Sequence, residues 1–151
     1  MTTNGRDSDP TTRLTVAHRG GDRFRIRVRG HEIDVDQPVG DGGEDTAPTP
    51  TELFVAGLAS CVAFYARRYL ARHGLPADGL EVTAGYETGS RPTRVVAVRI
   101  EVTPPAGLPP QRRHAMLAVA SHCTVHNTLT TPPAVDMRLV NATGALTRAE
   151  A

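Results

Sequence analysis

Several residue types are scarce or missing in this chain of 151 residues. It contains no lysine and no tryptophan, and aromatic residues make up 4% of it. The core must therefore be built from Val, Leu, Ile and Ala rather than from large aromatic side chains. An excess of charge of one sign is also lacking, because 17 basic residues, all arginines, stand against 16 acidic ones. The composition therefore does not indicate a face that binds nucleic acid or an anionic membrane.

Long apolar stretches are missing as well. Residues 1–12 are polar and lack the apolar segment of a secretory signal peptide, and no run approaches the roughly 20 apolar residues that span a bilayer. We therefore expect a cytoplasmic protein with no membrane partner. Cysteine is scarce too, with two residues, Cys61 and Cys123. In a reducing compartment they are better interpreted as catalytic or metal-binding thiols than as a structural disulfide.

After residues 1–11, which are expected to form a disordered tail, the chain alternates apolar and charged residues. Ile26 and Val28 alternate with arginines, and Ile33 and Val35 alternate with acidic residues. Alternation with a period of two predicts half-buried strands. Because one strand presents arginines and the next presents acids, antiparallel pairing would match their charges. The arginines are therefore interpreted as a sheet face rather than as a phosphate site.

The clearest local signal is the sequence T-P-T-E at residues 49–52. It has the pattern of a capping box, with proline at the first helical position. This signal predicts a helix over residues 50–73, closed by Gly74. Residues 53–65 are apolar or small on every face, which indicates a helix that is buried all round and too short to cross a membrane.

The rest of the pattern predicts two strands over 80–88 and 94–103, a helix over 110–122 and a last strand over 135–140. On the second helix, Met116, Ala120 and Cys123 would share one face, and a short helical turn would follow. Residues 145–151 are expected to be a frayed tail.

This order of elements is typical of an α+β domain, here over residues 12–144, with antiparallel sheets around two central helices. A helix that is apolar on every face needs covering on every side. One small sheet and one other helix can hardly provide that cover within a single chain. We therefore expect an intertwined homodimer.

The two cysteines have an inert and a reactive interpretation. Free cysteine is among the most buried residue types and often acts as a small hydrophobe. However, Cys61 and Cys123 both lie on helices expected to pack together, and small Ser60 and Ser121 beside them leave room for a reactant. Packed helices can bring Cα atoms to the roughly 4.4–6.8 Å that a disulfide requires. The residues by themselves leave both interpretations open.

Two segments carry both cysteines: PTPTELFVAGLASCVAF at residues 48–64 and SHCTVHNTL at residues 121–129. They resemble the OsmC/Ohr family of osmotically inducible and organic-hydroperoxide-resistance proteins. In that family a helix with the pattern P-x-E-L-x-x-A-x-x-A-x-C carries the reactive cysteine, and a C-P-V-H-type turn carries its partner. Here Thr124 stands in place of that proline. The strand order also matches, so the resemblance covers roughly residues 14–140.

The resemblance implies a thiol-dependent peroxidase that works without a metal or prosthetic group. Cys61 would attack a peroxide and become a sulfenic acid. Cys123 would then form a disulfide with it, which a dithiol reductant reopens. The apolar neighbours Leu58, Val62 and Phe64 would suit a small organic hydroperoxide. Two alternatives stay open: a non-peroxidatic member that binds a small apolar or thiol ligand at the dimer interface, and a structural protein with inert cysteines.

The residues that would activate Cys61 match the family less closely. A thiolate on an apolar helix needs a positive partner, because burial disfavours the charged form. In the peroxidase branches an arginine supplies that charge, and a glutamate directly after the helix-opening proline orients it. This chain has Thr51 at the glutamate position, and Glu52 follows one place later. Arg19 and Arg23, on either side of a Gly-Gly-Asp turn, are the candidates for the arginine.

A zinc site is a further alternative. His122, Cys123 and His126 have suitable ligand types, with Cys61 as a fourth ligand, but their spacing does not match a usual structural motif. We therefore expect no metal. His126 is better interpreted as packing against or capping the turn near the cysteines.

Overall fold

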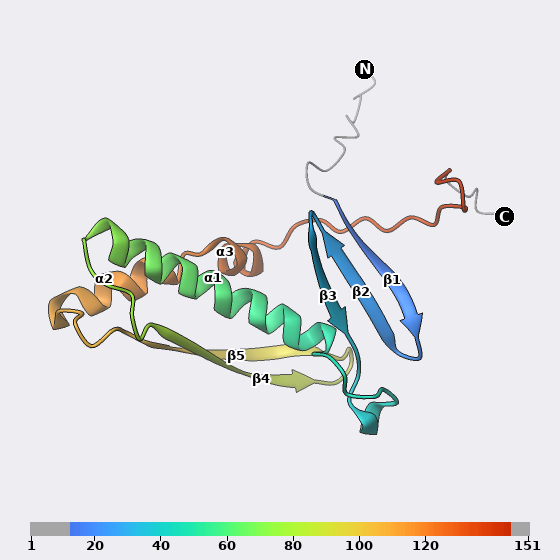
Figure 1. Cartoon of the computed structure of the whole chain (residues 1–151), viewed down its shortest axis with the longest axis horizontal. Coiled ribbons are helices and arrows are strands. Elements are labelled where there is room, and N and C mark those ends of the chain that lie inside the picture. The colour runs from blue at the N-terminus through green and yellow to red at the C-terminus, as the bar shows by residue number, and fades with distance from the viewer. Residues whose placement is uncertain (1–12, 146–151) are drawn as a thin grey trace, which may run out of the picture.

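The computed structural model describes residues 13–145 (Figure 1). The described strands are β1 Leu14–Gly20, β2 Arg23–Val28, β3 His31–Val35, β4 Glu81–Gly89 and β5 Arg94–Thr103. The described helices are the 3-10 helix η1 Val39–Asp41 and the α-helices α1 Pro50–Arg72, α2 Pro110–Ala120 and α3 Thr124–Thr130. The expected tail over 1–11, and all but the first residue of the tail over 145–151, lie outside the described residues.

The predicted α+β class is confirmed, with two antiparallel sheets of order β1–β2–β3 and β4–β5. Helix α1 lies along one face of β4 and β5 and also packs against α2 and α3 (Figure 1). The three-stranded sheet stands beyond the N-terminal end of α1 (Figure 1). The short helical turn expected after the second helix is a separate α-helix of seven residues, α3.

The charge matching predicted for the first sheet is confirmed. Strands β2 and β3 pair Arg25 with Asp34 and Arg27 with Glu32, and in each pair the arginine Nε lies 2.7 Å from a carboxylate oxygen. Hydrogen bonding from Arg25 lowers the pKa of Asp34, and hydrogen bonding from Arg27 lowers the pKa of Glu32. These side chains are solvent-exposed, so each pair contributes little to stability, and their main effect is to fix the register.

Helix α1 begins as predicted but is longer than the membrane argument assumed. Thr49 Oγ1 accepts the N–H of Glu52 at 3.1 Å, and Glu52 Oε2 accepts the N–H of Thr49 at 2.8 Å, which completes the capping box. With 23 residues, the helix is about 35 Å long at ~1.5 Å per residue. By length and composition alone it could therefore cross a membrane. The expectation that it is too short was wrong.

Packing, rather than length, makes α1 a core helix of this fold. Leu58, Val62 and Leu70 are at most 5% exposed, and they form one cluster with Met116 and Ala120 of α2. Partly buried residues of β4 and β5 pack against the same cluster: Val82, Val98, Ile100 and Val102. The hydrophobic core therefore lies between α1, α2 and the β4–β5 sheet.

Burial of α1 is not complete within one chain, which is the incomplete cover that the sequence argument expects of a single chain. Phe54 is 42% exposed and Phe64 is 56% exposed. Both are large aromatic side chains on a helix with an otherwise apolar N-terminal half. Large side chains of this kind usually need a cover, such as a protein–protein interface.

The prediction of a strand over residues 135–140 was wrong. The chain runs there as an extended segment past the first sheet (Figure 1), with a single bridge at Val140. Val135, Met137 and Leu139 alternate along it and are 78–88% exposed. The alternation typical of a strand is present, but among the described residues the strand pairing of this segment is limited to the bridge at Val140.

Asp36 organises the loop that leads from β3 to α1. It is 1% exposed, and its carboxylate accepts the N–H groups of Gln37, Glu44 and Thr46 at 2.8–3.2 Å and the Thr46 hydroxyl at 2.8 Å. The Thr46 N–H is the strongest of several hydrogen bonds that lower the pKa of Asp36 to about 2. The folded loop therefore favours the ionised carboxylate.

Replacing Asp36 with Asn should destabilise the protein in a pH-dependent way. The folded-state pKa of about 2 lies below the ordinary aspartate pKa of 3.8, so the stabilisation is complete above pH ~4 and is lost as the pH falls through ~2. The urea midpoint of Asp36→Asn should lie below that of the wild type at neutral pH, and the gap should close toward pH ~2. Urea titrations at three pH values test this. A gap that stays constant would show that the carboxylate charge is not involved.

Candidate functional site

Cys61 lies near the middle of α1 and is half-buried. It packs against the buried cluster that includes Leu58 and Val62, on the side of α1 that meets α3. The preceding Ser60 donates its hydroxyl hydrogen to the Gly57 carbonyl at 3.0 Å, so its polar group is engaged within the helix. Cys61 is thus held by a rigid element, and part of its surface is open to solvent.

Cys123 lies at the N-cap of α3 rather than on α2 as predicted. Helix α2 ends at Ala120, and Cys123 has the extended backbone of a cap, with φ −68° and ψ 156°. Its Sγ accepts the N–H of His126 at 3.4 Å, as serine or threonine does at most N-caps. The side chain is fully buried, at 0% exposed, in the same cluster as Met116 and Ala120.

The structure brings the two thiols together. Burial raises the pKa of the Cys123 thiol, the His126 N–H acts in the opposite direction, and a hydrogen bond with Cys61 raises the pKa further. Cys123 is therefore favoured as a protonated thiol. Both cysteines are free, and an internal disulfide between α1 and the start of α3 would join side chains that already interact.

A pair of hydroxyl groups that the sequence reasoning missed links the same two segments. The hydroxyls of Tyr65, on α1, and Thr124, directly after Cys123, are hydrogen-bonded at 2.9 Å. Tyr65 also contacts the ring of Phe64 edge-on at 5.8 Å, and the Arg68 guanidinium lies 5.9 Å from its ring centre. The available signal was the spacing, because a residue four positions after Cys61 lies on the same helix face.

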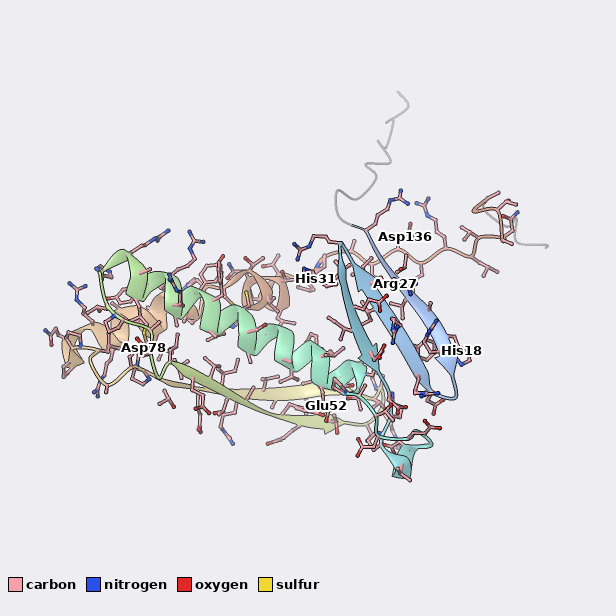
Figure 2. The ribbon with its side chains drawn as sticks, viewed as in Figure 1. His18, Arg27, His31, Glu52, Asp78 and Asp136 are labelled. Atoms are coloured by element: carbon pink, nitrogen blue, oxygen red, sulfur yellow. The ribbon has the colours of Figure 1, made fainter. Side chains whose placement is uncertain are left out.

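Glu52 lies in the first turn of α1 (Figure 2), where both functions of a capping box occupy it. Cys61 follows nine residues later, about 14 Å along the axis at ~1.5 Å per residue. Among the described residues no arginine forms an ion pair with Glu52, although other such pairs are present. Its geometry in a single chain is that of a helix cap.

Arg19 and Arg23 come together, but away from Cys61. They line a cavity of about 340 Å³ with Asp34 and Thr46. Arg23 Nη1 also lies 3.6 Å from Glu44, while its buried Nε has no hydrogen-bond partner. Most residues that line the cavity come from the first sheet, and that sheet lies beyond the N-terminal end of α1 (Figure 1). Within one chain, neither arginine is placed beside the thiols.

The histidines near Cys123 are engaged with the backbone. His122 Nδ1 lies 2.8 Å from the Ala118 carbonyl oxygen, and His126 Nδ1 contacts the Ser121 carbonyl oxygen. Over residues 13–145, no group of three or more His, Cys, Asp or Glu side chains is arranged to hold a metal ion. The backbone N–H of His126 donates to Sγ of Cys123, which is the N-cap of α3.

An apolar groove lies two helical turns from Cys61. It has a volume of about 500 Å³ and is lined by Phe54 of α1, by Val96 and Val98 of β5 and by Leu129 of α3. Phe54 precedes Cys61 by seven residues, so both lie on one face of α1. A larger hollow of about 550 Å³ lies on β4 and β5, and its lining includes the charged residues Glu87, Arg99 and Glu101. Neither cysteine lines either space. The first groove is the better candidate for an apolar ligand because its lining is mostly apolar, with Arg94 as its one charged residue.

The class defined by this arrangement is a two-thiol α+β protein whose cysteines meet between helices. A sequence model described as OsmC-like protein matches residues 42–138, which is more than half of the chain. The chain therefore belongs to the OsmC-like protein family, and the resemblance noted in the sequence is confirmed. No curated protein matches the chain significantly.

Solved structures show the same fold. A Psychrobacter arcticus protein, provisionally assigned to osmotic stress and detoxification, is 24% identical, with a TM-score of 0.74 over 80% of this chain and 89% of that one. The organic hydroperoxide resistance protein OhrB of Bacillus subtilis is 18% identical, with a TM-score of 0.59 over 81% and 92%. An OsmC-like protein of unknown function from Vibrio cholerae is 15% identical, with a TM-score of 0.66 over 80% and 94%. At these identities the likeness shows the fold.

Proposed function

We propose that this chain is a thiol-dependent peroxidase that reduces organic hydroperoxides through Cys61 and Cys123. The observation that carries the proposal is the contact between a half-buried thiol and a fully buried one. A peroxide from solvent can reach Cys61 but not Cys123. Cys61 is therefore the attacking residue and Cys123 the resolving residue.

The reaction balances with these two sulfurs and an external dithiol. The Cys61 thiolate attacks the distal peroxide oxygen, the O–O bond breaks, and the alkoxide leaves as an alcohol after taking a proton. The Cys123 thiol then attacks the sulfenic acid on Cys61. An S–S bond forms, the S–O bond breaks, and the hydroxide leaves as water with the proton of Cys123. The dithiol reopens the disulfide by exchange and is itself oxidised.

Burial of Cys123 supports its place in this cycle. Because burial raises the pKa of Cys123, its sulfur stays protonated and does not compete with Cys61 for peroxide. The same proton is then available to the hydroxide that leaves Cys61. No metal or prosthetic group takes part in the proposed cycle.

The apolar groove predicts a preference for organic peroxides. Cumene hydroperoxide should react faster than hydrogen peroxide by about tenfold or more, because burying its phenyl group against Phe54 and Leu129 contributes ~1.5 kcal/mol or more. The measurement is peroxide consumption with dithiothreitol, beside protein whose thiols have been alkylated with iodoacetamide. Faster reaction with hydrogen peroxide, or equal consumption by the alkylated protein, would contradict the proposal.

A second candidate function is a non-peroxidatic protein that binds a small apolar or thiol ligand in the same region. Two observations favour it: Glu52 is occupied by the capping box, and the cavity that Arg19 and Arg23 line in a single chain contains neither cysteine. The two functions give different results in the same assay. Thiols that react with a disulfide reagent, in a protein that consumes no peroxide, would identify the binding protein.

The proposal includes a second copy of the chain. In an intertwined homodimer, the β1–β2 hairpin of one subunit can supply Arg19 or Arg23 to the Cys61 thiolate of the other. A reducing compartment, the cytoplasm, fits a cycle that a dithiol must regenerate. The partners in this proposal are the second subunit, a small organic hydroperoxide and a dithiol reductant, and they include neither nucleic acid nor membrane.

A further inference from the structure

We infer that the hydrogen bond between Tyr65 and Thr124 positions the resolving cysteine for disulfide closure. This inference rests on the proposed two-cysteine function and adds two positioning residues to it. The bond joins α1, which carries Cys61, to the first residue of α3, whose N-cap is Cys123. It is a side-chain hydrogen bond between the two segments that must stay in register when the sulfurs react.

The anchor on α1 is well fixed. Tyr65 lies one helical turn after Cys61, and helical side chains lean toward the N-terminus, which brings the ring back over the turn that holds Cys61. The half-buried ring contacts Phe64 edge-on, with the Arg68 guanidinium over it. Its hydroxyl therefore has little freedom to move relative to Cys61.

The other end of the bond lies at the junction between α2 and α3, where Asn127 Nδ2 also donates to the His122 carbonyl and His126 Nδ1 contacts the Ser121 carbonyl. Ser121, His122 and Cys123 separate α2 from α3 and lie outside both helices. Thr124 is exposed, so no side-chain packing holds the first turn of α3 at this residue. The hydroxyl of Thr124 supplies a fixed point directly beside Cys123.

Because the bond restrains Cys123 and not Cys61, its loss should slow one step and spare the other. Removing either hydroxyl should slow disulfide closure about three- to tenfold, the rate equivalent of one hydrogen bond. The initial reaction of Cys61 should change by less than about twofold, because neither hydroxyl is needed for its exposure.

A disulfide reagent separates the steps without any peroxide. Ellman's reagent should react first at Cys61, releasing one thiolate in a phase that depends on reagent concentration. Cys123 then attacks the mixed disulfide on Cys61 and displaces the second thiolate, in a phase whose rate is independent of the reagent concentration. Tyr65→Phe and Thr124→Val should slow the second phase alone, and Thr124→Ser, which keeps a hydroxyl, should restore it. The double variant should be no slower than either single variant, because both remove the same bond.

Thr128→Val is the matched control, because the Thr128 hydroxyl bonds only within α3, to the Thr124 carbonyl at 2.8 Å. It should leave both phases unchanged. The inference is wrong if the second phase is as fast in Thr124→Val as in the wild type. It is also wrong if Thr128→Val slows the second phase as much as Thr124→Val does. Absence of peroxide turnover with a slowed second phase would overturn the peroxidase and leave this inference standing. Peroxide turnover together with an unchanged second phase would overturn this inference and leave the peroxidase standing.

Discussion

Replacing Cys61 with Ser should abolish peroxide consumption, and replacing Cys123 with Ser should leave a single turnover. Serine is a far weaker nucleophile than a thiolate at neutral pH, so we expect Cys61→Ser to react at least about 1000-fold more slowly. Cys123→Ser keeps the attacking sulfur and loses only the resolving one. Both variants make small changes in volume, so the fold should be retained.

The two variants are best compared before any reductant is added. Wild type and Cys123→Ser should each consume one equivalent of cumene hydroperoxide per chain, whereas Cys61→Ser should consume none. Wild type should end as an intramolecular disulfide, and Cys123→Ser as a sulfenic acid that dimedone traps and that excess peroxide oxidises further. Mass spectrometry distinguishes these products. If Cys61→Ser consumes as much peroxide as the wild type, Cys61 is excluded as the attacking residue.

The second large effect concerns assembly. We expect a mass near twice the 16.1 kDa of one chain, because the apolar side chains exposed in a single chain are too large and too numerous for a monomer surface. They are Phe54, Phe64, Val96, Leu117, Leu129, Val135, Met137, Leu139 and Val140. Sedimentation velocity at micromolar concentration measures the mass. A single species of one chain at all concentrations would contradict the homodimer.

A charge placed within this surface should weaken the dimer. Phe64→Glu should raise the dissociation constant by about tenfold or more, because it removes the apolar contact of a ring that is 56% exposed in the single chain. It also buries a carboxylate whose charged neighbour on the helix is Arg68. Gln111→Glu, at an exposed polar position of α2, adds the same charge without removing an apolar contact. Equal dissociation of the two variants would show that Phe64 lies outside the interface.

Local signals in the sequence were enough to predict most elements. The capping box specified the start of α1, and the alternating arginines specified β2 together with its pairing to β3. Both depend on neighbours within a few residues or on one hairpin. Helix α3 was predicted only as a short turn because Thr124, Val125 and Thr128 are β-branched and have weak helix propensity, and because its cap is a cysteine instead of a common cap residue.

Features that depend on distant parts of the chain were not predictable in the same way. The alternation over residues 135–140 indicates a strand, but a strand exists only where backbone partners are available, and the described chain offers no ladder there. The two cysteines could be singled out from their motifs, and the structure brings them together. The position of Arg19 and Arg23 could not be predicted, because it depends on how the first sheet is placed relative to α1.

The break between α2 and α3 determines which of the two sulfurs can move. Cys61 belongs to an uninterrupted helix, so its backbone cannot rotate without breaking main-chain hydrogen bonds. Cys123 lies between the two helices, so a change in its φ and ψ angles breaks fewer main-chain hydrogen bonds than the same change at Cys61. We therefore expect any adjustment that brings the sulfurs to bonding distance to fall on the short junction, while the long core helix keeps its position in the oxidised and the reduced protein.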